Sequence, residues 1–108
     1  MDLRQIRAFV TVAKERNFTR AAELLHIAQP AVSMSIAKLE EELELTLFNR
    51  ERKQVTLTAE GEVFFHHAER ILYACRAADT EMAELKGLAR GEVRIGIPPM
   101  MSSYYFPR

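Results

Sequence analysis

A stripe of apolar side chains, at alternating spacings of four and three, runs through the C-terminal half of this 108-residue chain. Its members are Phe64, Ala68, Ile71, Cys75, Ala78, Met82 and Leu85. This spacing is a heptad repeat, which places the side chains on one face of a long helix and is typical of two-stranded helical contacts. So short a chain has little left to cover such a helix. The stripe therefore predicts a helix that dimerises, with these residues at the interface.

The long helix is expected to begin after Thr58, whose hydroxyl can cap its first turn, and to lose its regularity at Gly87. These limits predict a dimerising linker helix over residues 58–88 and a hinge at 89–91. Within the remaining segment, residues 92–108, positions 93–97 alternate as a strand that stops at a pair of prolines, 98 and 99. Because one strand cannot form a domain, this segment is expected to be the stub of a larger, truncated domain.

The N-terminal part carries the pattern of two short helices. Apolar side chains recur at helical spacing up to residue 13 behind Asp2, which is a suitable N-cap. Residues 14–18 are expected to form a turn, after which Thr19 caps a second helix over residues 20–25. The small pair at 21–22 lets another helix approach closely, as a helix-turn-helix crossing requires.

A third helix is predicted after a turn at residues 26–28, with Pro30 at its first position. Its buried stripe consists of Val32, Ile36, Leu39 and Leu43. The side chains on the opposite face of its first two turns are small, polar or only weakly apolar. Such a face suits a helix that enters the major groove of DNA. Glutamates within 40–44 are expected to form a solvated end that stays away from phosphate.

A polar and basic excursion at residues 49–54 predicts a wing. It separates Leu47 and Phe48, expected to close the core, from an alternating segment at 55–57. Two short strands around a basic tip commonly lie over the DNA backbone or the minor groove. The predicted fold is therefore mostly α: a winged helix-turn-helix domain over residues 1–57 with a two-stranded wing, followed by the long dimerising helix.

The charge of the chain is zero overall but unevenly distributed. Basic residues outnumber acidic ones over residues 2–39 and again at 50–53, and the acidic run at 40–44 separates these segments. Two basic segments interrupted by acid indicate a local electrostatic footprint for nucleic acid rather than a uniformly basic surface.

The sequence disfavours an enzyme, a metalloprotein, a membrane protein and a secreted protein. The histidines and the single cysteine lack the spacing of metal ligands, and there is no nucleophile–base pair or phosphate-binding loop. We therefore expect no catalytic residue, no metal and no cofactor. No apolar run approaches a membrane span, charges interrupt the N-terminus where a secretory signal would be apolar, and one cysteine fits a reducing cytosol. These features predict a cytoplasmic protein without membrane contact.

The sequence resembles the LysR-type transcriptional regulators over residues 2–97. The resemblance is carried by NFTRAAELLHIAQPAVS at 17–33, LTAEG at 57–61 and GEVRIGI at 91–97. It implies a winged helix-turn-helix, a linker helix that dimerises antiparallel, and an effector-binding domain of two lobes. The last motif looks like the first strand of that domain, so a small-molecule effector would bind only in the missing part.

The resemblance also implies which residues contact DNA. On the recognition helix they are Gln29, Pro30, Ser33, Met34 and Ser35, and on the wing they are Arg50, Arg52 and Lys53. Gln29 is the strongest candidate, because its amide can both donate to and accept from a base edge. Lys38 is a further candidate, for a phosphate contact. Arg50 has a structural alternative, since an arginine just after the core often pairs with a local glutamate.

Three residues depart from the pattern of the family. Ala28 replaces a frequent serine, which leaves the recognition helix without a side-chain N-cap. Met34 stands where many members have arginine, and Ser35 where many have glutamine. We therefore expect fewer direct base contacts, with more of the specificity coming from the wing and from DNA shape.

The function predicted from these features is sequence-specific binding, as a homodimer, to a partly palindromic promoter site in double-stranded DNA. The full-length protein would be a ligand-responsive transcription regulator. One alternative is an architectural DNA-binding protein without ligand control, and another is a purely structural helical dimerisation module. Salt-dependent DNA binding would distinguish the last from the other two.

Overall fold

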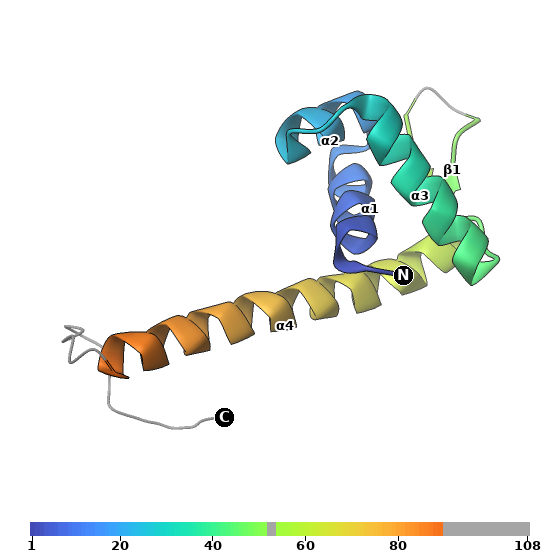
Figure 1. Ribbon diagram of the computed structural model, residues 1–108. Coiled ribbons are helices and arrows are strands. Elements are labelled where there is room, and N and C mark those ends of the chain that lie inside the picture. Colours follow the sequence, from blue (N-terminus) through green and yellow to red (C-terminus); the bar gives the residue numbers. More distant parts are fainter. Residues whose placement is uncertain (52–53, 90–108) are drawn as a thin grey trace. The chain divides into compact units, whose positions relative to one another are not determined.

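The computed structural model of the chain describes residues 1–51 and 54–89. In chain order the elements are α1 (Leu3–Glu15), α2 (Phe18–Leu25), α3 (Gln29–Leu43), β1 (Phe48–Asn49), β2 (Thr56–Leu57) and α4 (Ala59–Ala89) (Figure 1). The chain divides into a unit of residues 1–76, called the head below, and a second unit from residue 77 onward. The predicted fold class, mostly α with a two-stranded wing and a long final helix, is confirmed.

The first helix begins with a reciprocal cap. The Asp2 carboxylate accepts a hydrogen bond from the Gln5 backbone N–H at 2.9 Å, and the Gln5 side chain accepts one from the Asp2 backbone N–H, also at 2.9 Å. This capping box satisfies backbone donors that have no partner within the helix. The bond from Gln5 lowers the pKa of Asp2 below its ordinary value, and the positive charge of Arg4 adds to that effect.

The second helix begins earlier than predicted. Asn17, and not Thr19, is its N-cap: the Asn17 side chain accepts a hydrogen bond from the Arg20 backbone N–H at 2.8 Å. The first helix also reaches further, to Glu15, and ends where Arg16 adopts the left-handed conformation with φ of 57°. The loop between the helices is therefore much shorter than residues 14–18. Phe18 joins the second helix because its ring packs on Phe48, with centroids 6.1 Å apart.

The third helix has the buried stripe that its sequence predicts. Val32, Ile36 and Leu39 are fully buried, and Leu43 is partly buried against the same core. Its N-cap, Ala28, makes no side-chain hydrogen bond, as expected. The helix begins at Gln29, one residue before the predicted start, so Pro30 occupies its second position.

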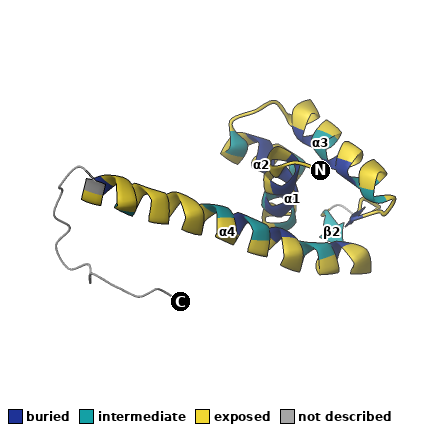
Figure 2. Ribbon diagram, turned by 60° about the horizontal axis from the view of Figure 1, so that its bottom comes forward, coloured by how far each residue is buried: buried dark blue, intermediate teal, exposed yellow. Residues whose placement is uncertain are grey.

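The core of the head is organised around Phe9. Its ring is fully buried and contacts Phe48 of β1 and Phe64 of α4, with centroids 5.2 and 5.0 Å away. Leu47 is also fully buried, so the prediction that residues 47 and 48 close the core is confirmed. Figure 2 shows that the buried residues lie where the helices of the head face one another.

The last helix starts as predicted but runs further. The Thr58 hydroxyl accepts a hydrogen bond from the Gly61 backbone N–H at 2.9 Å and donates one to the Thr46 carbonyl at 2.6 Å. The helix continues through Gly87 to Ala89, so the expectation that Gly87 ends its regularity is wrong. One glycine is tolerated inside a helix at a modest free-energy cost. Ala89, the first residue of the predicted hinge at 89–91, belongs to this helix, and the rest of the hinge and the predicted strand lie outside the described residues. None of the described helices is long and apolar enough to cross a membrane.

Glu40 connects the end of α3 to the wing. Its carboxylate accepts hydrogen bonds from the backbone N–H groups of Leu47 and Phe48, at 2.7 and 3.3 Å, and pairs with the Arg50 guanidinium at 3.1 Å. Its side chain is only 15% exposed. The expectation that all the glutamates at 40–44 are solvated is therefore wrong for Glu40, because this carboxylate satisfies backbone donors beside the core.

We expect the substitution Glu40→Gln to lower the free energy of unfolding by about 1.5–3 kcal/mol, the range for hydrogen bonds to a charged group. The amide removes the charge that holds two backbone N–H groups and the Arg50 guanidinium. Urea unfolding followed by circular dichroism measures the change. Glu41→Gln is the matched control, since that neighbouring side chain is exposed. Equal effects of the two substitutions would contradict the role given to Glu40.

Gly61 marks a close approach between the first turn of α4 and the segment before the wing. A Cβ atom at this position would overlap the backbone carbonyl oxygen of Leu47. We expect Gly61→Ala to destabilise the chain by about 1–3 kcal/mol, because backbone must move to accommodate the methyl group. The same unfolding measurement applies. The control is Val63→Ala at a side chain that is 62% exposed, and stabilisation by Gly61→Ala would contradict the close approach.

Candidate nucleic-acid interface

The face of α3 opposite its buried stripe is exposed along its first two and a half turns. Its exposed residues are Gln29, Pro30, Ala31, Met34, Ala37 and Lys38. Met34 has 61% of its surface exposed. The face carries no acidic side chain before Glu40. A slim helix surface without acid at its leading end can enter the major groove, which is about 12 Å wide.

The candidate residues of the first turn lie together. The Gln29 side-chain amide donates a hydrogen bond to the Ser33 hydroxyl at 3.1 Å. Ser33 and Ser35 are each half-buried. The contact holds Gln29 along the helix and leaves its amide oxygen and second N–H free to meet the edge of a base.

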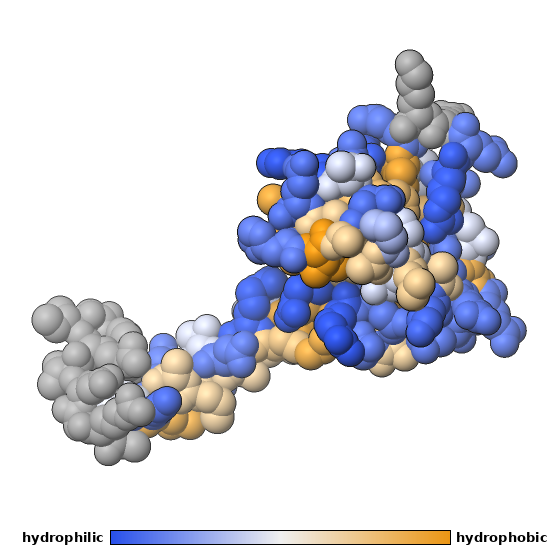
Figure 3. Space-filling model, turned by 45° about the horizontal axis from the view of Figure 1, so that its top comes forward, coloured by the Kyte–Doolittle hydropathy of each residue, from blue (hydrophilic) through white to orange (hydrophobic). Residues whose placement is uncertain are grey.

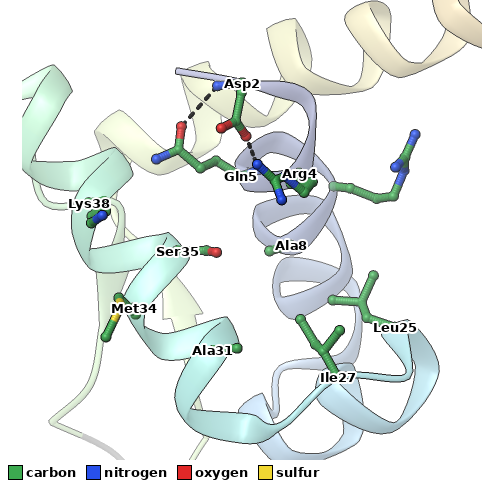
Figure 4. A pocket seen from close by; sticks show the side chains of 11 residues that line it. Asp2, Arg4, Gln5, Ala8, Leu25, Ile27, Ala31, Met34, Ser35 and Lys38 are labelled. Carbon is green, nitrogen blue, oxygen red and sulfur yellow. Dashed lines mark hydrogen bonds between the residues drawn. The ribbon is translucent and has the colours of Figure 1, made fainter.

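A groove of about 500 Å³ lies between α1 and α3, beside this face (Figure 4). Its walls include the predicted residues Met34, Ser35 and Lys38, and the sequence interpretation missed two cationic members, Arg4 and Arg7. Within the described part of the chain, neither Arg7 nor Lys38 forms a salt bridge. The signal that could have found Arg4 and Arg7 is their spacing of three, which places them on one helical face off the apolar stripe.

The wing candidates separate into two groups. The Arg50 guanidinium pairs with Glu40 and lies over the rings of Phe18 and Phe48, 5.7 and 5.9 Å from their centroids. This packing supports the structural alternative for Arg50. Arg52 and Lys53 lie outside the described residues. The strands on either side of them pair antiparallel, with Phe48 opposite Leu57.

The residues of the predicted dimer interface fall into two groups: the first ones along α4 pack against the core of the head, and the last ones are exposed. Ala68 is fully buried in the core of the head, so its side chain cannot face another chain, which corrects that part of the prediction. Phe64 and Ile71 are partly buried against the same core, where Phe65 and Leu72 also pack. Cys75 is half-buried and Ala78 is exposed. Met82 and Leu85 are 57% and 52% exposed, and Figure 2 shows this part of α4 exposed on most sides.

Other kinds of site find no support among the described residues. No group of three histidine, cysteine or carboxylate side chains is placed to hold a metal ion within residues 1–51 and 54–89. Cys75 is a free thiol in a helix, without a second cysteine in the sequence. Among the described residues, the strongest candidate for a functional site is the exposed face of α3 with its flanking cations.

Comparison with known proteins agrees with this arrangement. The family model described as "Bacterial regulatory helix-turn-helix protein, lysR family" matches residues 3–62. The chain is 44% identical over its full length to the RuBisCO operon transcriptional regulator of Allochromatium vinosum, covering 35% of that protein. It is 45% identical over 89% of its length to the regulator BsdA of Bacillus subtilis, covering 33% of it. The chain thus spans about a third of the length of these curated relatives.

Solved structures show the same fold. A complex of the DNA-binding domain of BenM with benA site 1 DNA matches with a TM-score of 0.75 and 39% identity, over 79% of this chain and 99% of that one. Vibrio fischeri DarR in complex with DNA matches with a TM-score of 0.75 and 31% identity, over 82% of this chain and 30% of that one. A family model that covers more than half of the residues, together with these relatives, shows that the chain belongs to the LysR family of bacterial helix-turn-helix regulatory proteins.

Proposed function

We propose that the chain binds double-stranded DNA in a sequence-specific manner and regulates transcription, with α3 in the major groove. The observation that carries the proposal is the exposed face of α3, free of acid at its leading end and flanked by the cations Arg4, Arg7 and Lys38. The DNA-bound domains of BenM and CbnR, which are 39% and 36% identical to this chain, support it. Its place of action is the cytoplasm, where bacterial promoter DNA lies.

The proposed division of labour places base reading on α3 and backbone contacts around it. Gln29 reads a base edge with its amide, and Pro30 and Ser33 form the close surface around it. Ser35 contributes from the groove between α1 and α3. Lys38 contacts a phosphate, and Arg52 and Lys53 place the wing tip on the backbone or in the minor groove. DNA shape supplies a larger share of specificity, because α3 offers no arginine to the groove.

We further propose that two chains pair through α4. The exposed part of the heptad stripe, formed by Ala78, Met82 and Leu85, is apolar, and the corresponding face of a second copy can cover it. Two heads then read a partly palindromic site, with half-sites one helical turn apart or a multiple of that. In the full-length protein, a small effector bound elsewhere would switch this assembly.

An architectural DNA-binding protein is the second candidate function. The exposed face of α3 is apolar and has few hydrogen-bonding groups, which favours this alternative, because the protein could then bind many sequences through contacts to the DNA backbone alone. Selection from a library of genomic DNA separates the two. An enriched two-fold motif supports the regulator, whereas salt-sensitive binding without a motif supports the architectural protein.

The roles given to Lys38 and Gln29 predict different losses of DNA affinity. Lys38→Ala should weaken binding to all sequences about equally and lower the slope of log K against log salt by about 1, because one phosphate contact is lost. Gln29→Ala should cost about 1–3 kcal/mol at the selected site and relax the preference for one base. Fluorescence anisotropy over a salt series measures both.

The control for these two variants is Lys86→Ala, in the last turn of α4, a residue that is not among those proposed to contact DNA. It should leave both the affinity and the salt slope unchanged. If Lys38→Ala also altered base preference, or Gln29→Ala changed only the salt slope, the assigned division of labour would be wrong.

The pairing through α4 predicts that charge on its exposed stripe separates the chains. The double substitution Met82→Lys and Leu85→Lys should convert the dimer to a monomer, because two lysines on each chain would be buried in an apolar interface. Sedimentation velocity measures the mass. Thr80→Lys, on the opposite side of the helix, is the control and should remain dimeric. A dimer that survives the double substitution would refute this interface.

A further inference from the structure

The exposed surface of α3 is largely apolar. Pro30, Ala31, Met34 and Ala37 are all exposed there, and Ile27, in the preceding turn, is 45% exposed. Figure 3 shows apolar surface gathered on one face of the head and bordered by hydrophilic side chains. Met34 is the only long apolar side chain on the exposed face of α3, so it determines what that face can touch.

The cations around this surface indicate what covers it. Arg4 and Arg7 on α1, together with Lys38 on α3, line the same groove as Met34. An apolar protein partner would leave these charges without a counterpart. A DNA strand satisfies both features, because its phosphates meet the cations while its base edges meet the helix between them. Charge complementarity therefore favours DNA as the occupant.

The groups that the bases present in the major groove then indicate which base Met34 can contact. Its base edges present hydrogen-bond donors and acceptors and a single kind of apolar group, the C5-methyl of thymine. A thioether side chain has no donor and only a weak acceptor, so it offers little to guanine, adenine or cytosine. An exposed methionine on this face gains most from burying a methyl group.

We propose that Met34 reads the C5-methyl group of a thymine in each half-site, an assignment that rests on the proposed DNA binding. Figure 4 shows Met34 on the side of α3 turned away from α1, while Ala31 and Ser35 point toward α1. The unbranched side chain can adjust its torsions to the position of the methyl group. Its small neighbours Ala31 and Ala37 leave room for the base edge to approach.

The test replaces thymidine by deoxyuridine, which removes only the methyl group and keeps the base pair. The probe is a synthetic duplex of the motif selected from the genomic library, substituted one thymidine at a time. At one position in each half-site, substitution should weaken binding by the wild-type chain about fourfold, and about fifteenfold when both half-sites are changed. Anisotropy titration at one fixed salt concentration gives the ratios.

Variants of the chain test whether Met34 is the residue that contacts the methyl group. Met34→Ala should bind thymidine and deoxyuridine duplexes equally, whereas Met34→Leu, which keeps a long apolar side chain, should preserve the preference. Lys38→Ala should weaken binding to both duplexes by the same factor. Both positions, 34 and 38, are at the exposed surface, and circular dichroism verifies that each of the three variants is folded.

Each outcome bears on the proposal. A deoxyuridine effect that persists in Met34→Ala assigns the methyl group to another residue, and no effect at any thymidine shows that methyl groups are not read; either result overturns the inference while leaving DNA binding intact. Failure to bind any DNA, or binding without a motif, instead overturns the proposed sequence-specific function. The two failures are therefore distinguishable.

Discussion

The head depends on one ring, that of Phe9. It is fully buried and meets Phe48 from the wing and both Phe64 and Phe65 from α4, with centroids between 5.0 and 6.4 Å away. Edge and tilted aromatic pairs of this kind add to the free energy of burial itself. Because β1 and α4 both pack on this ring of α1, and the buried stripe of α3 belongs to the same core, the exposed face of α3 is held on a fixed frame. Base reading requires such a frame, since hydrogen bonds and methyl contacts tolerate little displacement.

A second constraint acts at the other end of α3. The Glu40 carboxylate accepts hydrogen bonds from the backbone N–H groups of Leu47, just before β1, and of Phe48, within it, so the end of α3 and the start of the wing are linked. The same carboxylate holds Arg50, which then stacks over Phe18 and Phe48. Arg50 thus stabilises the head, and the DNA contacts proposed for the wing rest on Arg52 and Lys53.

Much of the candidate site could be predicted from local pattern. The outward face of the third helix follows from its periodicity, because burying Val32, Ile36 and Leu39 fixes which side chains point away. The spacing of Arg4 and Arg7 shows only that they share one face of α1, whereas their place in the same groove as Lys38 depends on the packing of α1 against α3. The heptad stripe was misleading for Ala68 for a similar reason. A periodic stripe predicts a buried face, but not whether the cover comes from the same chain or from another one.

The sequence by itself determined the helices, the uncapped start of α3, the wing and the family, because each is written in the order of neighbouring residues: helical periodicity, turn residues and the motifs at 17–33 and 57–61. Only the tertiary structure decided that Asn17 caps α2, that Glu40 is a structural ligand of backbone N–H groups, and that the first part of the α4 stripe belongs to the core of the head. These outcomes depend on which surfaces meet. A carboxylate or an apolar stripe has the same sequence signature in solvent, in a core or at an interface, and its free energy is set by the groups brought against it.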